Sequence, residues 1–181
     1  MEKTILQKAT FGGGCFWCTE TIFKQLKGVE NVVSGYSGGK VKHPNYSEVS
    51  EGNSGHAESI QITFDPKIIS YEKLLEVFFL THNPTTPDRQ GNDIGSQYRS
   101  VIFYHNEEQK KLAEEVKLRV EAEKIYTAPI VTEITTYTAF YPAESYHQNY
   151  YEKNPDQPYC QLVISPKLVK FREKFSKLLK R

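Results

Sequence analysis

The spacing of apolar and polar residues predicts alternating strands and helices along most of the chain. Segments in which β-branched and aromatic residues alternate with polar ones predict strands at 4–11, 29–36, 57–64, 98–104 and 130–134. Apolar residues at helical spacing, bounded by capping or stop residues, predict helices from Cys15 to about Leu26, after Ser70, and from Asn106 to about Ile125. A short helical turn is expected at 46–49.

Two segments rich in glycine and proline, 37–45 and 82–95, interrupt this pattern. Both predict long loops, and loops of this length inside a compact domain usually carry function. The C-terminal part of the chain is less regular. We expect a short helix within 142–151, an extended segment over 156–166 and a basic amphipathic helix over 167–181.

Strands of this kind with helices packed on one face form an α+β fold. We expect a two-layer α/β sandwich with a ferredoxin-like plait as its core and a mixed sheet. The C-terminal third is expected to be largely irregular and to end in a helix. The 181 residues are enough for one domain with a substantial core and few for two, so we expect a single domain over 1–181.

Charge and composition exclude several classes of protein. With 23 Lys and Arg against 22 Asp and Glu, the formal charge is +1, so no strong field draws the protein to nucleic acid or to a membrane. No apolar run is long enough to cross a bilayer, and the N-terminus lacks the apolar region of a signal peptide. Three cysteines do not suit a secreted disulfide scaffold. We therefore expect a cytoplasmic protein.

The glycine run Gly12–Gly14, followed directly by Cys15, is the most informative stretch of the chain. Glycines between a strand and a helix allow a sharp turn, which places Cys15 in the first turn of the helix. The free N–H groups and the helix dipole favour an anion there. We therefore expect a thiolate with a lowered pKa, which is the nucleophilic form of cysteine.

The CxxC spacing of Cys15 and Cys18 leaves three other interpretations. The two cysteines can be small apolar residues that pack into the core, a redox pair of the thioredoxin kind, or half of a zinc site. Zinc needs four ligands. The remaining cysteine is Cys160, and the five histidines show no paired spacing, so we expect no metal.

Eight short motifs resemble, in the same order, those of the A-type peptide methionine sulfoxide reductases. They extend from about Phe11 to Cys160, and they are Gly14–Trp17, Gly35–Gly39, Pro44–Tyr46, Gly55–Glu58, Arg89–Asp93, Gln97–Ser100, Phe140–Glu144 and His147–Gln148. Any one motif is weak, but eight in order are specific. Members of this family reduce the S epimer of methionine sulfoxide, free or in proteins, and have a two-layer α/β fold. The resemblance implies the same activity, and hence repair of oxidised proteins, for this chain.

The resemblance also implies a role for each matching residue. Cys15 corresponds to the nucleophile that attacks the sulfoxide sulfur, and Glu58 to the acid that protonates the oxygen. Burial is expected to keep Glu58 protonated at neutral pH. Tyr46 and Tyr98 match the tyrosines that bind the oxygen, and Asp93 matches a polar residue that orders the site through hydrogen bonds.

Phe16 and Trp17 correspond to an apolar wall that receives the ε-methyl group, where sulfur–aromatic contacts favour the substrate. Without the resemblance, each of these positions has a purely structural interpretation. Glu58 would be a solvated carboxylate at a strand edge, Asp93 a turn residue, and the aromatic residues part of the core.

Attack on a sulfoxide would leave a sulfenic acid on Cys15, which condenses readily with a nearby thiol. Many family members carry the resolving cysteine at the position of Cys160, in a proline-flanked segment that we expect to be mobile. We therefore interpret 154–181 as the resolving-cysteine segment and C-terminal helix, with Cys18 as an alternative first resolver or a second relay thiol. No cofactor is implied, because an external dithiol such as thioredoxin would reduce the disulfide. We expect a monomer.

Two departures from the family pattern concern the route of the electrons. Many members have glycine at the position of Cys18, and some carry a further cysteine in a glycine-rich tail, which this chain replaces with a basic helix. Two other functions therefore stay open. One is a general CxxC thiol–disulfide oxidoreductase, and the other is a redox sensor or peptide-binding module without catalytic activity.

Overall fold

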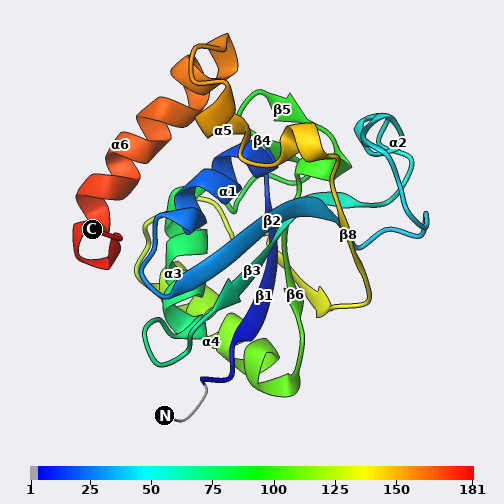
Figure 1. Ribbon diagram of the computed structural model, residues 1–181. Helices are drawn as coiled ribbons and strands as arrows, with labels where there is room; N and C mark the ends of the chain where they lie inside the picture. The colour runs from blue at the N-terminus through cyan, green and yellow to red at the C-terminus, as the bar shows by residue number, and fades with distance from the viewer. Residues whose placement is uncertain (1–3) are drawn as a thin grey trace.

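A curved six-stranded sheet forms the centre of the molecule (Figure 1). The computed structural model describes residues 4–181. The strands lie in the order β7 (Glu133–Thr136), β6 (Ser100–Tyr104), β1 (Gln7–Gly13), β3 (Ala57–Phe64), β2 (Val29–Ser37) and β8 (Phe140–Pro142). Neighbouring strands are antiparallel except β6 and β7, which are parallel. The predicted α+β class with a mixed sheet is confirmed.

Three helices pack on one face of this sheet, namely α1 (Phe16–Lys24), α3 (Tyr71–Thr81) and α4 (Glu107–Ala122). Phe11 of β1 points toward them, and its ring centroid lies 5.8 Å from that of Phe23 and 4.9 Å from that of Phe78. Each fully buried apolar side chain of this size contributes roughly 1.5–3 kcal/mol. The core therefore fixes α1 firmly on the sheet, with its first residue close to the end of β1.

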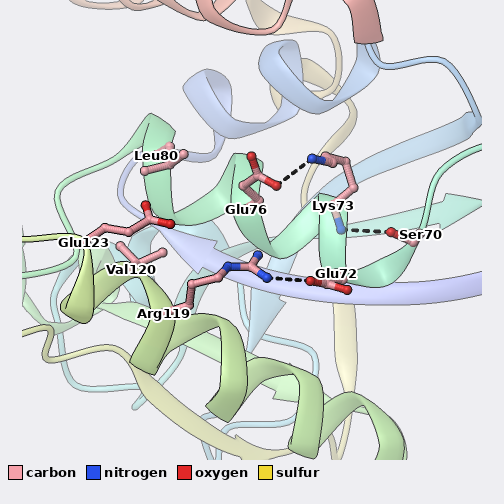
Figure 2. A pocket seen from close by; sticks show the side chains of 8 residues that line it. All are labelled: Ser70, Glu72, Lys73, Glu76, Leu80, Arg119, Val120 and Glu123. Carbon is pink, nitrogen blue, oxygen red and sulfur yellow. Dashed lines mark hydrogen bonds and ion pairs between the residues drawn. The ribbon is translucent and has the colours of Figure 1, made fainter. Parts of the chain in front are cut away.

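Helices α3 and α4 lie side by side and carry charged side chains where they meet the solvent (Figure 2). Arg119 of α4 pairs with Glu72 of α3 at 2.6 Å, and Lys73 pairs with Glu76 at 2.6 Å. These groups border a groove of about 490 Å³. All four side chains are partly exposed, so each pair contributes only about 0–1 kcal/mol. The helix predicted from Asn106 to about Ile125 is confirmed by α4.

The C-terminal segment is more helical than the sequence predicts. It consists of the short turn η2 (Ser145–His147), α5 (Tyr150–Lys153), the π-helical turn η3 (Cys160–Ile164), α6 (Ser165–Lys174) and the turn η4 (Ser176–Leu178). The prediction of an extended segment over 156–166 is wrong, because η3 runs directly into α6. Pro166 lies in the first turn of α6, where proline does not disturb a helix. Helix α6 packs along the outside of α1 (Figure 1).

Other differences from the predicted elements are small. The expected helical turn at 46–49 is α2 (Tyr46–Ser50), which confirms it. The strand expected at 98–104 begins at Ser100, because residues 96–98 form the turn η1 (Ser96–Tyr98). The long loop at 82–95 contains a small hairpin of β4 (Arg89–Gln90) and β5 (Asp93–Ile94). The short edge strand β8 was not predicted.

The expectation that the chain starts without a signal peptide rests partly on residues 1–3, which lie outside the described residues. Within residues 4–181, no helix is both long enough and apolar enough to cross a membrane.

Candidate active site

The glycine turn joins β1 to α1 and requires glycine at its last position. Gly14 has a φ of +84°, a left-handed conformation that glycine adopts without strain. A Cβ atom at Gly14 would lie 2.6 Å from Cγ of Gln90. Gln90 cannot easily move aside, because its side-chain amide forms two hydrogen bonds with the backbone of Asn83, at 3.0 and 2.9 Å. The turn and the 82–95 loop are thus packed closely together.

Cys15 and Glu58 meet at the start of α1. Cys15 is the N-cap residue of α1, as predicted. The next residue, Phe16, donates its backbone N–H to Oε2 of Glu58 at 3.0 Å. Glu58 lies on β3 and is only 3% exposed. The interpretation of Glu58 as a solvated strand-edge carboxylate is therefore wrong.

The burial of the Glu58 carboxyl dominates its pKa. Burial raises the pKa of Glu58 to about 8, while the hydrogen bond from Phe16 lowers it and the charges of Asp93 and Cys18 raise it further. Removal of water thus outweighs the hydrogen bond. The expected burial of Glu58 is confirmed, and with a pKa of about 8 the carboxyl carries a proton at neutral pH that it can donate.

The buried thiols of Cys15 and Cys18, one helical turn apart, shift each other's pKa. Burial raises the pKa of Cys15 well above its ordinary value, the hydrogen bond with Cys18 and the charge of Glu58 raise it further, and the N–H of Trp17 lowers it. The hydrogen bond from Cys15 lowers the pKa of Cys18. The predicted lowering of the Cys15 pKa is therefore wrong for this conformation, because loss of water outweighs the helix N-terminus. In a pair with these shifts, the first proton leaves from Cys18.

The two tyrosines reach the site from different elements. Tyr46 begins α2, which Asn45 and Glu48 cap by exchanging hydrogen bonds of 2.9 and 2.8 Å. Tyr98 ends the turn η1. Burial raises the pKa of both phenols, and the charges of Glu58 and Cys15 also raise it. Both side chains are therefore neutral hydrogen-bond donors within electrostatic reach of Glu58.

A cavity of about 260 Å³ opens beside Cys15. Its other lining residues come from the 82–95 loop and from the C-terminal segment: Gln90, Gly91, Asn92, Asp93, Tyr159, Leu162, Val163 and Lys167. The hydroxyl of Tyr159 donates a hydrogen bond to Oδ2 of Asp93 at 2.6 Å. This bond joins the two walls of the cavity. The predicted residue Asp93 thus lies beside Cys15, whereas Tyr46, Tyr98 and Glu58 do not line this cavity.

Phe16 and Trp17 belong to an aromatic cluster at the start of α1. The ring of Phe16 lies 5.8 Å from that of Tyr36 and 5.0 Å from that of His147. Trp17 stacks on Tyr150 with ring centroids 3.6 Å apart. Its Nε1 donates a hydrogen bond to Nδ1 of His147 at 3.1 Å. These contacts hold both side chains in fixed positions next to Cys15.

Cys160 lies inside the protein, at the first residue of η3. It is 0% exposed, and its carbonyl accepts a hydrogen bond from Oγ of Ser165 at 3.0 Å. Burial raises the pKa of Cys160, and the charge of Cys18 raises it further. The expected position on an extended segment is therefore wrong, and Cys160 does not line the cavity beside Cys15.

A match to a protein family decides between the functions that the sequence leaves open. Residues 7–179 match the family described as peptide methionine sulfoxide reductase. The chain belongs to this family. It is therefore an oxidoreductase that acts on methionine sulfoxide, which excludes a module without catalytic activity.

Individual relatives of this reductase agree with the family match. The peptide methionine sulfoxide reductase MsrA of Sulfolobus acidocaldarius is 57% identical over 171 residues, which cover 94% of this chain and 96% of that protein. The reduced form of Mxr1 from Saccharomyces cerevisiae has a TM-score of 0.80 and 34% identity, covering 86% of this chain and 89% of that one. Mxr1 in complex with Trx2 has a TM-score of 0.57 and 26% identity, covering 80% and 84%. The resemblance to A-type reductases is confirmed, and a general CxxC oxidoreductase is not favoured.

Sequence reasoning missed three residues around the reductase site. Tyr159 and Lys167 line the cavity beside Cys15, and Tyr150 stacks on Trp17. Tyr159 directly precedes Cys160 in the sequence, which is a signal that was available. No sequence pattern indicated Lys167, because its place beside the cavity depends on the turn η3, which the sequence did not predict.

Proposed function

We propose that this reductase acts on the S epimer of methionine sulfoxide, free or in proteins, with Cys15 as nucleophile and Glu58 as acid. One observation carries the proposal: the buried carboxyl of Glu58 accepts a hydrogen bond at 3.0 Å from the residue that follows Cys15. A sulfoxide oxygen leaves only when it is protonated, so reduction needs a neutral acid beside a sulfur nucleophile. The product is methionine, and the biological role is repair of oxidised proteins.

The first half of the reaction uses the protons already present at the site. The Cys18 thiolate accepts the proton of Cys15, and the resulting Cys15 thiolate attacks the sulfoxide sulfur. Glu58 donates its proton to the sulfoxide oxygen. The oxygen is transferred to the Cys15 sulfur, methionine leaves, and Cys15 becomes a sulfenic acid. The substrate loses its oxygen and gains two electrons, so it is reduced. Cys15 gives up these two electrons and is oxidised.

The remaining site residues bind and orient the substrate. The hydroxyls of Tyr46 and Tyr98 donate hydrogen bonds to the sulfoxide oxygen, because both phenols are neutral and near Glu58. Phe16 and Trp17 form the apolar wall that receives the ε-methyl group. Asp93 orders the cavity wall through its hydrogen bond from Tyr159.

Removing either tyrosine hydroxyl is expected to slow reduction. Tyr46→Phe and Tyr98→Phe should each lower kcat about tenfold, because a hydrogen bond to developing charge contributes about 1.5 kcal/mol. The rate of methionine formation with excess dithiothreitol measures this. Tyr104→Phe, at the end of β6, is the matched control and should keep the wild-type rate. Wild-type rates in both site variants would contradict the assigned roles.

Regeneration needs a disulfide and an external reductant. We propose that Cys160 or Cys18 resolves the sulfenic acid and that a dithiol of the thioredoxin type then reduces the disulfide without a cofactor. Mxr1, which this chain resembles, has been solved in complex with Trx2, and this supports the choice of reductant.

We also propose a monomeric, single catalytic domain over 1–181, with 154–181 as the resolving-cysteine segment and C-terminal helix. Its three cysteines are all free, which supports work in a reducing compartment such as the cytoplasm, without nucleic-acid or membrane partners. The order β6-β1-β3-β2 of the four central strands, with antiparallel neighbours, supports the description of the core as a ferredoxin-like plait.

The two epimers of free methionine sulfoxide test the proposed function directly. With dithiothreitol as reductant, the S epimer should yield methionine, and the R epimer should react at least about 100-fold more slowly. Chromatographic measurement of methionine from each epimer gives the ratio. Equal rates for the two epimers, or turnover of neither, would contradict the proposal.

A further inference from the structure

A second cavity, of about 270 Å³, lies next to the cavity beside Cys15, between the end of α3 and α6. Leu80 of α3, with Phe171 and Phe175 of the C-terminal segment, gives it an apolar lining. The ring centroids of the two phenylalanines lie 5.7 Å apart. Lys167 lines both cavities. We call the second cavity the α6 groove, and it adjoins the site at Lys167.

Three lysines, Lys167, Lys170 and Lys174, line the α6 groove. They are three and four residues apart on α6 (Figure 1), and residues with this spacing share one face of a helix. A helix rises about 1.5 Å per residue, so the three positions extend about 10 Å from the cavity beside Cys15 toward the end of α6. We call these three residues the lysine row.

The charges of the lysine row have no partner in the part of the chain that the structure describes. None of the three takes part in an ion pair within residues 4–181, and no carboxylate lines the α6 groove. The carboxylate in the wall of the cavity beside Cys15 is Asp93, which already accepts a hydrogen bond at 2.6 Å. Lys170 and Lys174 are exposed. The row is thus a local concentration of positive charge on a chain whose formal charge is only +1.

We propose that the lysine row binds acidic residues that flank methionine sulfoxide in protein substrates, so that the reductase favours acidic segments over neutral ones. This preference rests on the proposed function, in which the methionine sulfoxide reacts at Cys15. It gives a role to the basic helix at the C-terminus, which the chemistry of the sulfoxide does not use.

The length of the row suits a short peptide segment. An extended peptide rises about 3.3 Å per residue, so about three residues pass along a row of about 10 Å. Carboxylates within about five residues of a methionine sulfoxide at Cys15 therefore lie within reach of the lysines. Three ammonium groups within a Debye length of about 10 Å act together on such a segment. Free methionine sulfoxide has no flanking residues and does not reach the groove.

The place of the row favours a substrate over the external dithiol as its partner. Lys167 lines the same cavity as Cys15, whereas Cys18 and Cys160 do not line it. In the proposed reaction, Cys15 is the cysteine that meets the sulfoxide, and the dithiol attacks a disulfide. The row therefore faces the residues that flank a bound methionine sulfoxide.

The test uses two synthetic peptides that each contain one methionine S-sulfoxide, with dithiothreitol as reductant. One peptide has aspartates on both sides of the methionine sulfoxide, and the other has asparagines at the same positions, which keep the shape and remove the charge. The wild type should reduce the acidic peptide with about tenfold higher kcat/KM, mainly through a lower KM, because several exposed ion pairs of ordinary strength act together. This preference should vanish at about 1 M salt, where the Debye length is about 3 Å.

A double variant tests whether the row causes the preference. Lys170→Gln with Lys174→Gln removes two charges and leaves Lys167, which lines both cavities, in place. Its ratio of kcat/KM between the two peptides should fall to about twofold. Lys177→Gln with Lys180→Gln is the matched control, because it removes two exposed lysines that line neither cavity, and it should keep the wild-type ratio. The ratio compares two substrates on the same enzyme, so loss of some enzyme through misfolding does not change it.

The outcomes separate the lysine row from the proposed function. Equal kcat/KM for the two peptides in the wild type, or a preference of wild-type size in Lys170→Gln with Lys174→Gln, would overturn the role of the row while methionine formation upholds the proposed function. No methionine from either peptide would overturn both. Turnover of free methionine S-sulfoxide with thioredoxin as reductant tests the other partner. A higher KM for thioredoxin in the double variant, with an unchanged peptide ratio, would assign the row to the reductant and overturn the proposal.

Discussion

Cys15→Ser is expected to abolish methionine formation, with a loss on the order of 10³-fold or more in the rate of the first turnover. A serine hydroxyl is a far weaker nucleophile than a thiolate, and it cannot accept the oxygen of the substrate to form a sulfenic acid. Serine is also a favourable N-cap residue, so α1 should remain intact. Rapid-quench measurement of methionine released from the S epimer gives the rate.

The comparison for Cys15→Ser is Cys160→Ser, which removes another buried cysteine but should still release methionine in the first turnover. Circular dichroism and the thermal midpoint of each variant report whether the fold is kept. Methionine formation by folded Cys15→Ser would show that another group performs the attack.

Glu58→Gln is expected to slow the first turnover by about 10²–10⁴-fold, the usual range for loss of general acid catalysis. The amide of glutamine can still accept the N–H of Phe16 through its carbonyl oxygen, so the start of α1 keeps its hydrogen bond. It cannot transfer a proton to the sulfoxide oxygen. The measurement is the single-turnover rate at pH 7 with saturating methionine S-sulfoxide.

Glu72→Gln is the matched control for Glu58→Gln, because Glu72 is a partly exposed carboxylate that pairs with Arg119 in the groove between α3 and α4 (Figure 2). It should keep the wild-type rate and lose at most about 1 kcal/mol of stability. A Glu58→Gln enzyme as fast as Glu72→Gln would assign the proton to a different donor.

Local sequence patterns predict much of the fold and the position of Cys15 at the start of a helix. Alternating residues at 57–64 predict β3, and the glycine run predicts a turn with Cys15 at the first turn of a helix, which is its position as N-cap of α1. The burial of Glu58 was expected only through the family resemblance, because the local pattern favours a solvated carboxylate at a strand edge. The predictions of β3 and of the turn before α1 succeed because each depends on neighbours in sequence.

Other features depend on tertiary contacts that the sequence does not display. Prolines around Cys160 suggested an extended segment, but packing of α6 against α1 favours a helix in which Pro166 is tolerated in the first turn. The pKa of Cys15 was predicted from the helix dipole, which acts locally. Burial of the Cys15 thiol acts in the opposite direction, and it depends on how the C-terminal segment covers the site.

The dependence of the single-turnover rate on pH tests the central claim most directly, because the Cys15 thiolate and the protonated Glu58 are required together. Loss of the Glu58 proton with a pKa of about 8 should stop the rise of the wild-type rate near pH 8, and the rate should fall about tenfold per pH unit once the thiolate is fully formed at higher pH. Glu58→Gln should lack this fall, so its slower rate should rise with pH to a plateau. A wild-type rate that keeps rising above pH 8, or the same alkaline fall in Glu58→Gln, would contradict the account.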